Sequence, residues 1–180
     1  FASNSTSRNG VSFSCDKDKV DAMALEIKSL ESQLKLSAYG SAQLSKQLIL
    51  NAGIENIDYM WQQYSLPNIN LVISVLPHWS TFLRVASSFY PGHSVSPLAV
   101  LENILLALYS RITKGAYLIL LVENEYLNGT YSTISWEIVD MLKKHFTFKY
   151  EKIVCVQKTT ELPSIESEIA HKYLLVFRKK

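Results

Sequence analysis

The sequence predicts an α/β fold with a mostly parallel sheet and an antiparallel last strand. Short apolar runs rich in β-branched residues alternate with stretches of helical periodicity, which is typical of parallel sheets whose strands are joined by helices. The last two strands, by contrast, are joined through a loop around Pro163 without a helical stretch, and such a connection suits an antiparallel pair. At 180 residues the chain is long enough for one domain with an apolar core.

The first third of the chain contains two predicted strands and two predicted helices. Residues 11–15 form a short strand that runs into Asp16, and residues 19–36 form a helix because their apolar side chains recur at helical spacing. Residues 47–50 are a second strand, and residues 54–64 are a short helix. Small, polar stretches predict loops at residues 1–10 and 37–45.

The middle third contains the most apolar strands. Residues 71–75 and 117–122 are continuous apolar runs with the length of buried parallel strands, and residues 82–90 are predicted to be helical.

A longer helix is predicted between these strands. Pro97 suits its first turn and Ser96 is placed to cap it, while its apolar stripe extends to Ile112. We expect Lys114 and Gly115 to close this helix, because a basic residue and a glycine are common at helix ends.

The last third is predicted to contain a helix at residues 136–145 and strands at residues 146–157 and 173–177. Asn128 and Gly129 mark a loop before the helix.

The composition is that of an ordinary globular protein, with 48% hydrophobic and 19% charged residues. No apolar run reaches the roughly 18 residues of a membrane span, and no signal peptide is visible. Cys15 and Cys155 form neither a disulfide framework nor a zinc site, so we expect an intracellular setting, no metal and no membrane partner.

The net charge of +2 is weak evidence for any partner, but basic residues gather in the last quarter of the chain. A solvated face and a basic tail account for them, and a nucleic-acid surface is the alternative. The residues are Lys143, Lys144, Lys149, Lys152, Lys158, Arg178, Lys179 and Lys180.

Several segments, in order, carry a family resemblance. Phe1–Thr6 resembles an F-x-G-x-G-T loop, and Val11–Asp18 resembles a strand that ends in an acid. Leu71–Trp79 resembles a strand that runs into (D/N/S)-P-P-(Y/F/W), and Thr113–Leu118 resembles "LKPGGYL". In the tail, His171–Lys179 resembles a strand with the sequence "HEYLLVFRK".

Together these segments resemble the class I S-adenosylmethionine (AdoMet)-dependent DNA methyltransferases that modify adenine N6 or cytosine N4. The resemblance spans nearly the whole chain and implies a Rossmann-like methyltransferase fold. It also implies that the strand preceding the F-x-G-x-G loop lies before Phe1, so we expect one domain over residues 1–180 that lacks its first strand and belongs to a longer chain.

The resemblance implies a cofactor site for AdoMet. In the family, glycines of the first motif allow close approach of the backbone, and the acid after the second strand accepts hydrogen bonds from ribose hydroxyls. The corresponding residues in this sequence are Phe1, Ser3, Ser5, Asp16 and Asn51.

The catalytic motif position is Val75-Leu76-Pro77-His78. In the family this segment holds the exocyclic amine of a flipped base by a polar side chain and a prolyl carbonyl, and an aromatic residue stacks on the base. His78 or Trp79 is the candidate stacking residue here, and packing is the structural alternative for Trp79.

Both motifs depart from the family pattern. Ser3 and Ser5 replace glycines, and their Cβ atoms crowd the cofactor. Val75 has no side-chain acceptor, and Leu76 replaces the first proline. These changes favour a fold kept without methyl transfer, in a subunit that binds nucleic acid, DNA rather than RNA, or an active sister subunit.

Two other functions are open. One is active, AdoMet-dependent methylation of a nucleobase amine, by direct attack of nitrogen on the methyl group. The other is a different nucleotide-binding domain, such as a dehydrogenase, which the absence of G-x-G-x-x-G disfavours.

Overall fold

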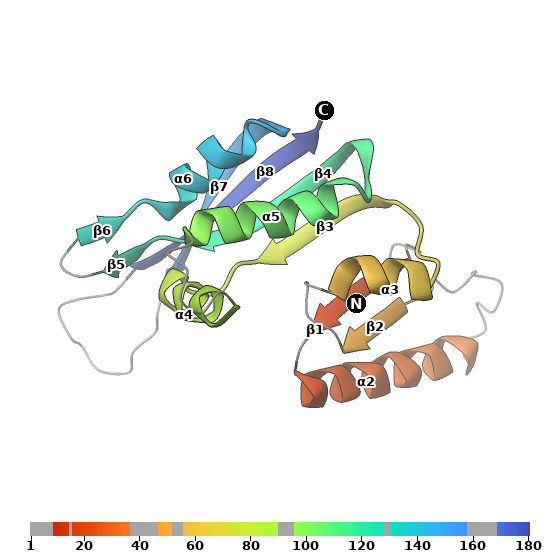
Figure 1. Ribbon diagram of the computed structural model, residues 1–180. Coiled ribbons are helices and arrows are strands. Elements are labelled where there is room, and N and C mark those ends of the chain that lie inside the picture. Colours follow the sequence, from red (N-terminus) through yellow and green to blue (C-terminus); the bar gives the residue numbers. More distant parts are fainter. Residues whose placement is uncertain are drawn as a thin grey trace, which may run out of the picture. The chain divides into compact units, whose positions relative to one another are not determined.

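The computed structural model forms two compact units, Phe1–Ser65 and Leu66–Lys180 (Figure 1). The single domain without its first strand stays a prediction. The structure describes residues 9–14, 16–36, 47–51, 56–89, 96–127, 130–157 and 169–180.

The first unit is built around two parallel strands, β1 (Gly10–Ser14) and β2 (Gln47–Asn51). Their register pairs Gly10 with Gln47 and Ser14 with Asn51, so both strands end at the same sheet edge. The strands predicted at residues 11–15 and 47–50 are thus confirmed, except that Cys15 lies outside the described residues.

Helices α2 (Lys17–Leu36) and α3 (Ile57–Gln63) complete this unit. Among the described residues of this unit four apolar side chains are buried, and the ring of Phe13 stacks on one of them, Trp61, at 6.1 Å between centroids. The buried side chains are Val20, Leu50, Ile57 and Trp61. Both predicted helices exist, and α2 begins two residues earlier than predicted.

The second unit contains a four-stranded sheet of order β3-β4-β8-β7. Strands β3 (Ile69–Val75) and β4 (Ile112–Glu123) are parallel, whereas β8 (Ile169–Lys179) runs antiparallel to β4 and to β7 (Phe146–Gln157). The predicted reversal of the last strand is confirmed, and this strand lies between β4 and β7.

Helices α5 (Pro97–Tyr109) and α6 (Ile134–Leu142) pack on one face of the sheet, and α4 (Trp79–Phe89) contacts α5 (Figure 1). Alternate side chains of each strand point to the same face of the sheet. Four of those on the face that the helices cover have no exposed surface. These residues are Leu118, Leu120, Leu175 and Phe177.

The opposite face of β3 is open in this unit. Leu71 is 42% exposed, and Ile73 and Val75 are each 66% exposed, although all three are apolar. They alternate with Val72 and Ser74, which pair with the buried Leu118 and Leu120 of β4.

The prediction that Lys114 and Gly115 close a helix is wrong. Helix α5 ends at Tyr109, where Ser110 continues in a right-handed conformation, and β4 begins at Ile112. Gly115 lies inside β4 with φ of +80°, a conformation that L side chains rarely adopt. The glycine therefore bends a strand, and the β3–β4 register shifts beside it, between Ile69 and Leu71.

Ser96 is the N-cap residue of α5, as predicted, but its side chain makes no capping hydrogen bond. Helix α4 begins three residues earlier than predicted, at Trp79. Helix α6 begins two residues earlier than predicted and ends at Leu142, because residues 143–145 form a turn into β7.

A small hairpin precedes α6. Strand β5 (Glu125–Leu127) pairs antiparallel with β6 (Thr130–Ser132), where the sequence predicted only a loop. Asn128 and Gly129 lie outside the described residues. Within the described ranges, no helix is long and apolar enough to span a membrane.

Candidate functional site

The predicted catalytic segment lies at the carboxyl end of β3. Val75 is the last residue of the strand, and Leu76, Pro77 and His78 connect it to α4. The backbone N–H of Leu76 donates to the carbonyl of Leu121 at 2.9 Å, so the segment stays paired with β4 as it leaves the sheet. Ligands of open α/β sheets bind at this edge, outside the carboxyl ends of the strands.

His78 lies among charged side chains from two other segments. Its Nδ1 is 3.3 Å from Oε1 of Glu125, and its Nε2 is 4.0 Å from Oε2 of Glu123. The same Glu123 oxygen is 3.6 Å from Nζ of Lys172 on β8. We call these four residues the strand-end cluster. The His78–Glu125 pair is at ion-pair distance without the geometry of a hydrogen bond.

Glu125 caps a helix as well as contacting His78. Its Oε2 accepts a hydrogen bond from the backbone N–H of Ser80 at 3.2 Å, in the first turn of α4. The N–H groups there lack partners within the helix and carry a partial positive charge, so a carboxylate is stabilising. The side chain of Glu125 is only 11% exposed. Oε2 is thus engaged by α4, whereas the buried Oε1 lies beside His78 and accepts no hydrogen bond from described residues.

Trp79 packs in the interior of its unit. It is 9% exposed, and its ring stacks on that of Phe82 with 5.0 Å between centroids and 15° between planes. Of the two roles open for Trp79, packing is the one that this position supports. His78, with a side chain 63% exposed, is the aromatic residue of the motif that faces solvent.

Asn124, which lies between Glu123 and Glu125 in the sequence, makes a second set of polar contacts. Oδ1 of Asn124 accepts a hydrogen bond from the N–H of Ser135 at 2.9 Å and so holds the first turn of α6 to the end of β4. Burial raises the pKa of the Tyr173 phenol, with Tyr131 contributing in the same direction, while a hydrogen bond with Asn124 opposes the shift. These neighbours fix the hairpin and α6 against the strand ends.

The predicted cofactor residues are described only in part. Phe1, Ser3 and Ser5 lie outside the described residues. Asp16 follows β1, and Asn51 is the last residue of β2, so the structure brings these two to one edge of the two-stranded sheet.

Asp16 is the N-cap of α2. Its Oδ1 accepts from the Lys19 N–H at 3.2 Å, its Oδ2 lies 3.2 Å from Lys19 Nζ, and its carbonyl accepts from the Val20 N–H at 3.1 Å. The hydrogen bond from the Lys19 backbone holds the pKa of this carboxyl below its usual range. The cap explains why α2 begins at Lys17. Because the carboxylate of Asp16 already caps this helix, a ribose hydroxyl would have to bind oxygens that also accept from Lys19.

Glu123, Glu125 and Lys172 were missed as site residues. Glu123 had a visible signal, since it is an acid directly after an apolar strand. Glu125 and Lys172 had none, because they reach His78 and Glu123 only through the hairpin and the insertion of β8. Within the described ranges, no group of three His, Cys, Asp or Glu side chains could hold a metal ion.

Solved structures similar to this fold are AdoMet-dependent methyltransferases. TrmN from Thermus thermophilus matches with a TM-score of 0.55 and 13% identity, over 96% of this chain and 37% of its own. TehB from Haemophilus influenzae matches with 0.53 and 11%, over 96% and 50%. The precorrin-6y C5,15-methyltransferase of Geobacter metallireducens matches with 0.51 and 12%, over 96% and 69%.

These likenesses show that the fold is the Rossmann-like fold of AdoMet-dependent methyltransferases. The chain spans 37% of TrmN and half of TehB, so the likeness concerns a part of those proteins. No family model matches the sequence, and no curated protein matches it.

Proposed function

We propose that this chain is a methyltransferase-fold subunit, similar to the nucleobase amino-methyltransferases, that has lost methyl transfer and binds nucleic acid or a catalytic sister subunit. The proposal rests on the small number of hydrogen-bond acceptors at the end of β3. An amino-methylating site needs hydrogen-bond acceptors there. They accept from the N–H groups of the target amine and so point its lone pair at the methyl group.

The end of β3 offers few such acceptors. Val75 has no polar side-chain atom, Oε2 of Glu125 is occupied by the Ser80 N–H, and Oε1 of Glu125 is buried beside His78. Leaving one N–H of the amine unpaired in a dry pocket costs about 1–3 kcal/mol, which corresponds to about one to two decades in rate. The burial of Trp79 adds to this, because it removes one of the two candidate stacking residues.

Two measurements test the proposal. Calorimetry with AdoMet should show little heat, since Ser3 and Ser5 stand where glycines allow close approach. Radiolabelled AdoMet incubated with the protein and with duplex or single-stranded DNA should leave no more label in the DNA than a heat-inactivated control. Micromolar AdoMet affinity, or label above that control, would refute the loss of methyl transfer.

The second candidate is an active nucleobase amino-methyltransferase. Glu123 favours it, because its carboxylate is 24% exposed beside His78 and could accept from an amine in place of the missing oxygen at Val75. If label does appear in the DNA, Glu123→Ala should abolish it. Glu137→Ala, at an exposed position on α6, should leave it unchanged.

A further inference from the structure

The charges of this chain are unevenly distributed. The segments 109–114, 143–149 and 178–180 contain eight of the 18 Lys and Arg residues and no Asp or Glu. The rest of the chain therefore has ten basic residues against 16 acidic ones. A net charge of only +2 hides this separation, which is typical of proteins with a localised electrostatic surface.

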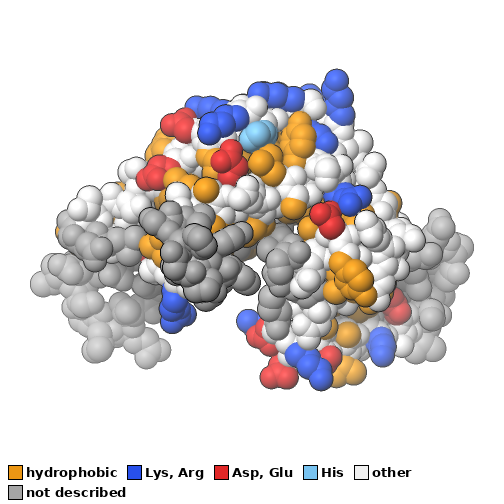
Figure 2. Space-filling view, in the orientation of Figure 1, with side chains coloured by type: hydrophobic (Ala, Val, Ile, Leu, Met, Phe, Trp, Pro, Cys, Tyr) orange, Lys and Arg blue, Asp and Glu red, His pale blue; other side chains and the backbone are white. Residues whose placement is uncertain are grey.

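The fold brings the three segments together at one end of the second unit. The start of β7 pairs with the end of β8, with Phe146 opposite Lys179. Nζ of Lys179 donates to the carbonyls of Tyr109 and Ile112, at 2.8 and 2.7 Å. Figure 2 shows Lys and Arg side chains gathered along the upper edge of this unit. We call this surface the basic end; its charged residues are Arg111, Lys114, Lys143, Lys144, Lys149, Arg178, Lys179 and Lys180.

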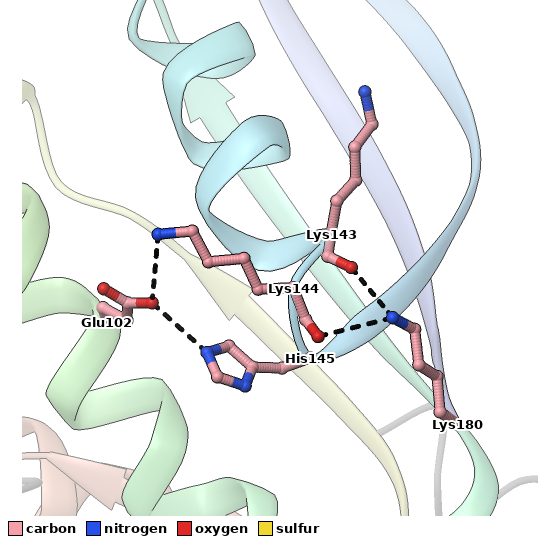
Figure 3. A network of polar contacts seen from close by, with 5 residues as sticks. All are labelled: Glu102, Lys143, Lys144, His145 and Lys180. Carbon is pink, nitrogen blue, oxygen red and sulfur yellow. Dashed lines mark hydrogen bonds and ion pairs between the residues drawn. The ribbon is translucent and has the colours of Figure 1, made fainter.

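Part of this charge serves the fold. Lys180 Nζ donates to the carbonyls of Lys143 and Lys144, at 3.0 and 3.3 Å, just beyond the carboxyl end of α6 (Figure 3). Glu102 of α5 lies 4.0 Å from Lys144 Nζ and 3.2 Å from His145 Nε2 (Figure 3). Of the lysines of the basic end, Lys143 pairs with Asp140 at 3.3 Å and Lys144 pairs with Glu102.

Two lysines have no role within the described part of the fold. The side chains of Lys114 and Lys149 are exposed and form no ion pair or hydrogen bond with described residues. Lys149 lies where the β7–β8 register shifts between Phe148 and Tyr150, and such irregularities redirect side chains.

The chemistry of the basic end favours a phosphate backbone. The exposed hydroxyls of Thr113 and Thr147 lie among the cations, and Ser/Thr and Lys/Arg are the usual donors to nucleic-acid phosphates. Of the large hydrophobic side chains exposed in the described residues, only Tyr117, which pairs with Arg178, and Tyr150, which follows Lys149, border the three segments. A membrane surface would call for several apolar side chains to insert, whereas two tyrosine rings could add base stacking, which tolerates any sequence, to the phosphate contacts.

We infer that the basic end binds the phosphate backbone of nucleic acid without reading its sequence. Lys114 lies near the start of β4 and Glu123 of the strand-end cluster at its end, and the nine residue steps between these positions, at about 3.3 Å each, separate them by roughly 30 Å. The nucleic acid is thus held by a surface remote from the end of β3. The inference deepens the proposed function, which expects a nucleic-acid partner, and it requires no AdoMet.

The test is fluorescence anisotropy of a labelled, mixed-sequence DNA duplex of about two helical turns, without AdoMet, with the full 180-residue chain. The variant Lys114→Gln/Lys149→Gln should weaken binding roughly tenfold near 0.1 M salt and reduce the slope of log K against log salt by about two. The matched control is Lys17→Gln/Lys28→Gln on α2, which removes the same charge from exposed positions. Unfolding curves of both variants should match that of the parent.

Three results would overturn the inference. One is equal weakening by both double variants, which would indicate a response to net charge alone. Another is binding of polyglutamate as tightly as DNA, which would indicate an acidic protein partner. The third is binding to phosphatidylserine vesicles that DNA does not displace. If the protein transfers methyl groups from AdoMet to DNA, the proposed loss of methyl transfer is refuted, but the DNA binding expected at the basic end is unchanged. Failure of the proposed function and failure of this inference can therefore be told apart.

Discussion

His78 and Glu125 meet at 3.3 Å although they are 47 positions apart and belong to different elements. The same carboxylate accepts from the Ser80 N–H, so one side chain from the hairpin contacts both His78, which ends the predicted catalytic segment, and the first turn of α4. The structural role of Glu125 therefore competes with any chemical role at this edge of the sheet.

We predict that Glu125→Ala lowers the free energy of unfolding by about 1–2 kcal/mol, because α4 loses its capping carboxylate. Glu125→Gln should retain much of the stabilisation by the cap, since the glutamine amide oxygen can also accept from the Ser80 N–H. Urea unfolding measures both. His78→Ala is the comparison and should cost less than about 1 kcal/mol, as exposed pairs do. An equal cost for His78→Ala and Glu125→Ala would mean that the ring contact, not the cap, matters.

A second prediction concerns Asn124 and Ser135. Asn124→Ala removes the acceptor of the buried Ser135 N–H and should cost about 1–3 kcal/mol of unfolding free energy. Ser135→Ala should be nearly neutral, because the fully buried Ser135 Oγ has no hydrogen-bond partner among the described residues. A large loss in Ser135→Ala would show that its hydroxyl has a partner in solution.

The two faces of the sheet should respond differently to truncation. Leu118 has no exposed surface under the helices, and Leu118→Ala should cost about 2–5 kcal/mol. Ile73, on the open face and 66% exposed, should tolerate Ile73→Ala within about 1 kcal/mol. Denaturant unfolding compares the two variants. If Ile73→Ala proved as costly as Leu118→Ala, the open face of β3 would be covered in solution.

Asp16 gives the first unit an acid-sensitive contribution. Its folded-state pKa is lowered, so its stabilising effect is complete above the unfolded pKa near 3.8 and is lost as the pH falls through the lower, folded value. Asp16→Asn keeps a capping side chain and should remove this pH dependence, while Asp16→Ala should also lower the helical circular dichroism signal at neutral pH. The control is Asp21→Asn, within α2. A parent whose acid transition equals that of Asp16→Asn would contradict the prediction.

The sheet could be predicted from the sequence because its strands are long and apolar. The strand at residues 146–157 was predicted with the bounds of β7, and the reversed last strand followed from the absence of a helix before it. The end of α5 could not be predicted in the same way. Lys114 and Gly115 resemble a helix end, yet α5 stops at Tyr109 without a glycine, and Gly115 instead allows β4 to bend.

The hairpin before α6 and the strand-end cluster were harder to predict. Three-residue strands have too few residues for a visible alternation, although Asn128-Gly129 between Tyr126 and Tyr131 was a signal that favours a hairpin. The approach of Glu125 to His78 depends on where the hairpin folds back, which is a tertiary effect. Pattern reasoning therefore proposed a candidate site at Val75 to His78, which stays a prediction, but it did not indicate the charged neighbours of His78.

The position of β8 between β4 and β7 has a consequence for synthesis of the chain on the ribosome. Strand β7 is translated before β8, and among the described strands it pairs with β8 alone. At roughly 5–20 residues per second, β7 spends about a second or more as a nascent strand with unsatisfied backbone groups, open to pairing with a neighbouring chain. The sheet closes only once β8 has emerged, so a chaperone that shields nascent strands should raise the yield of folded protein most during that interval.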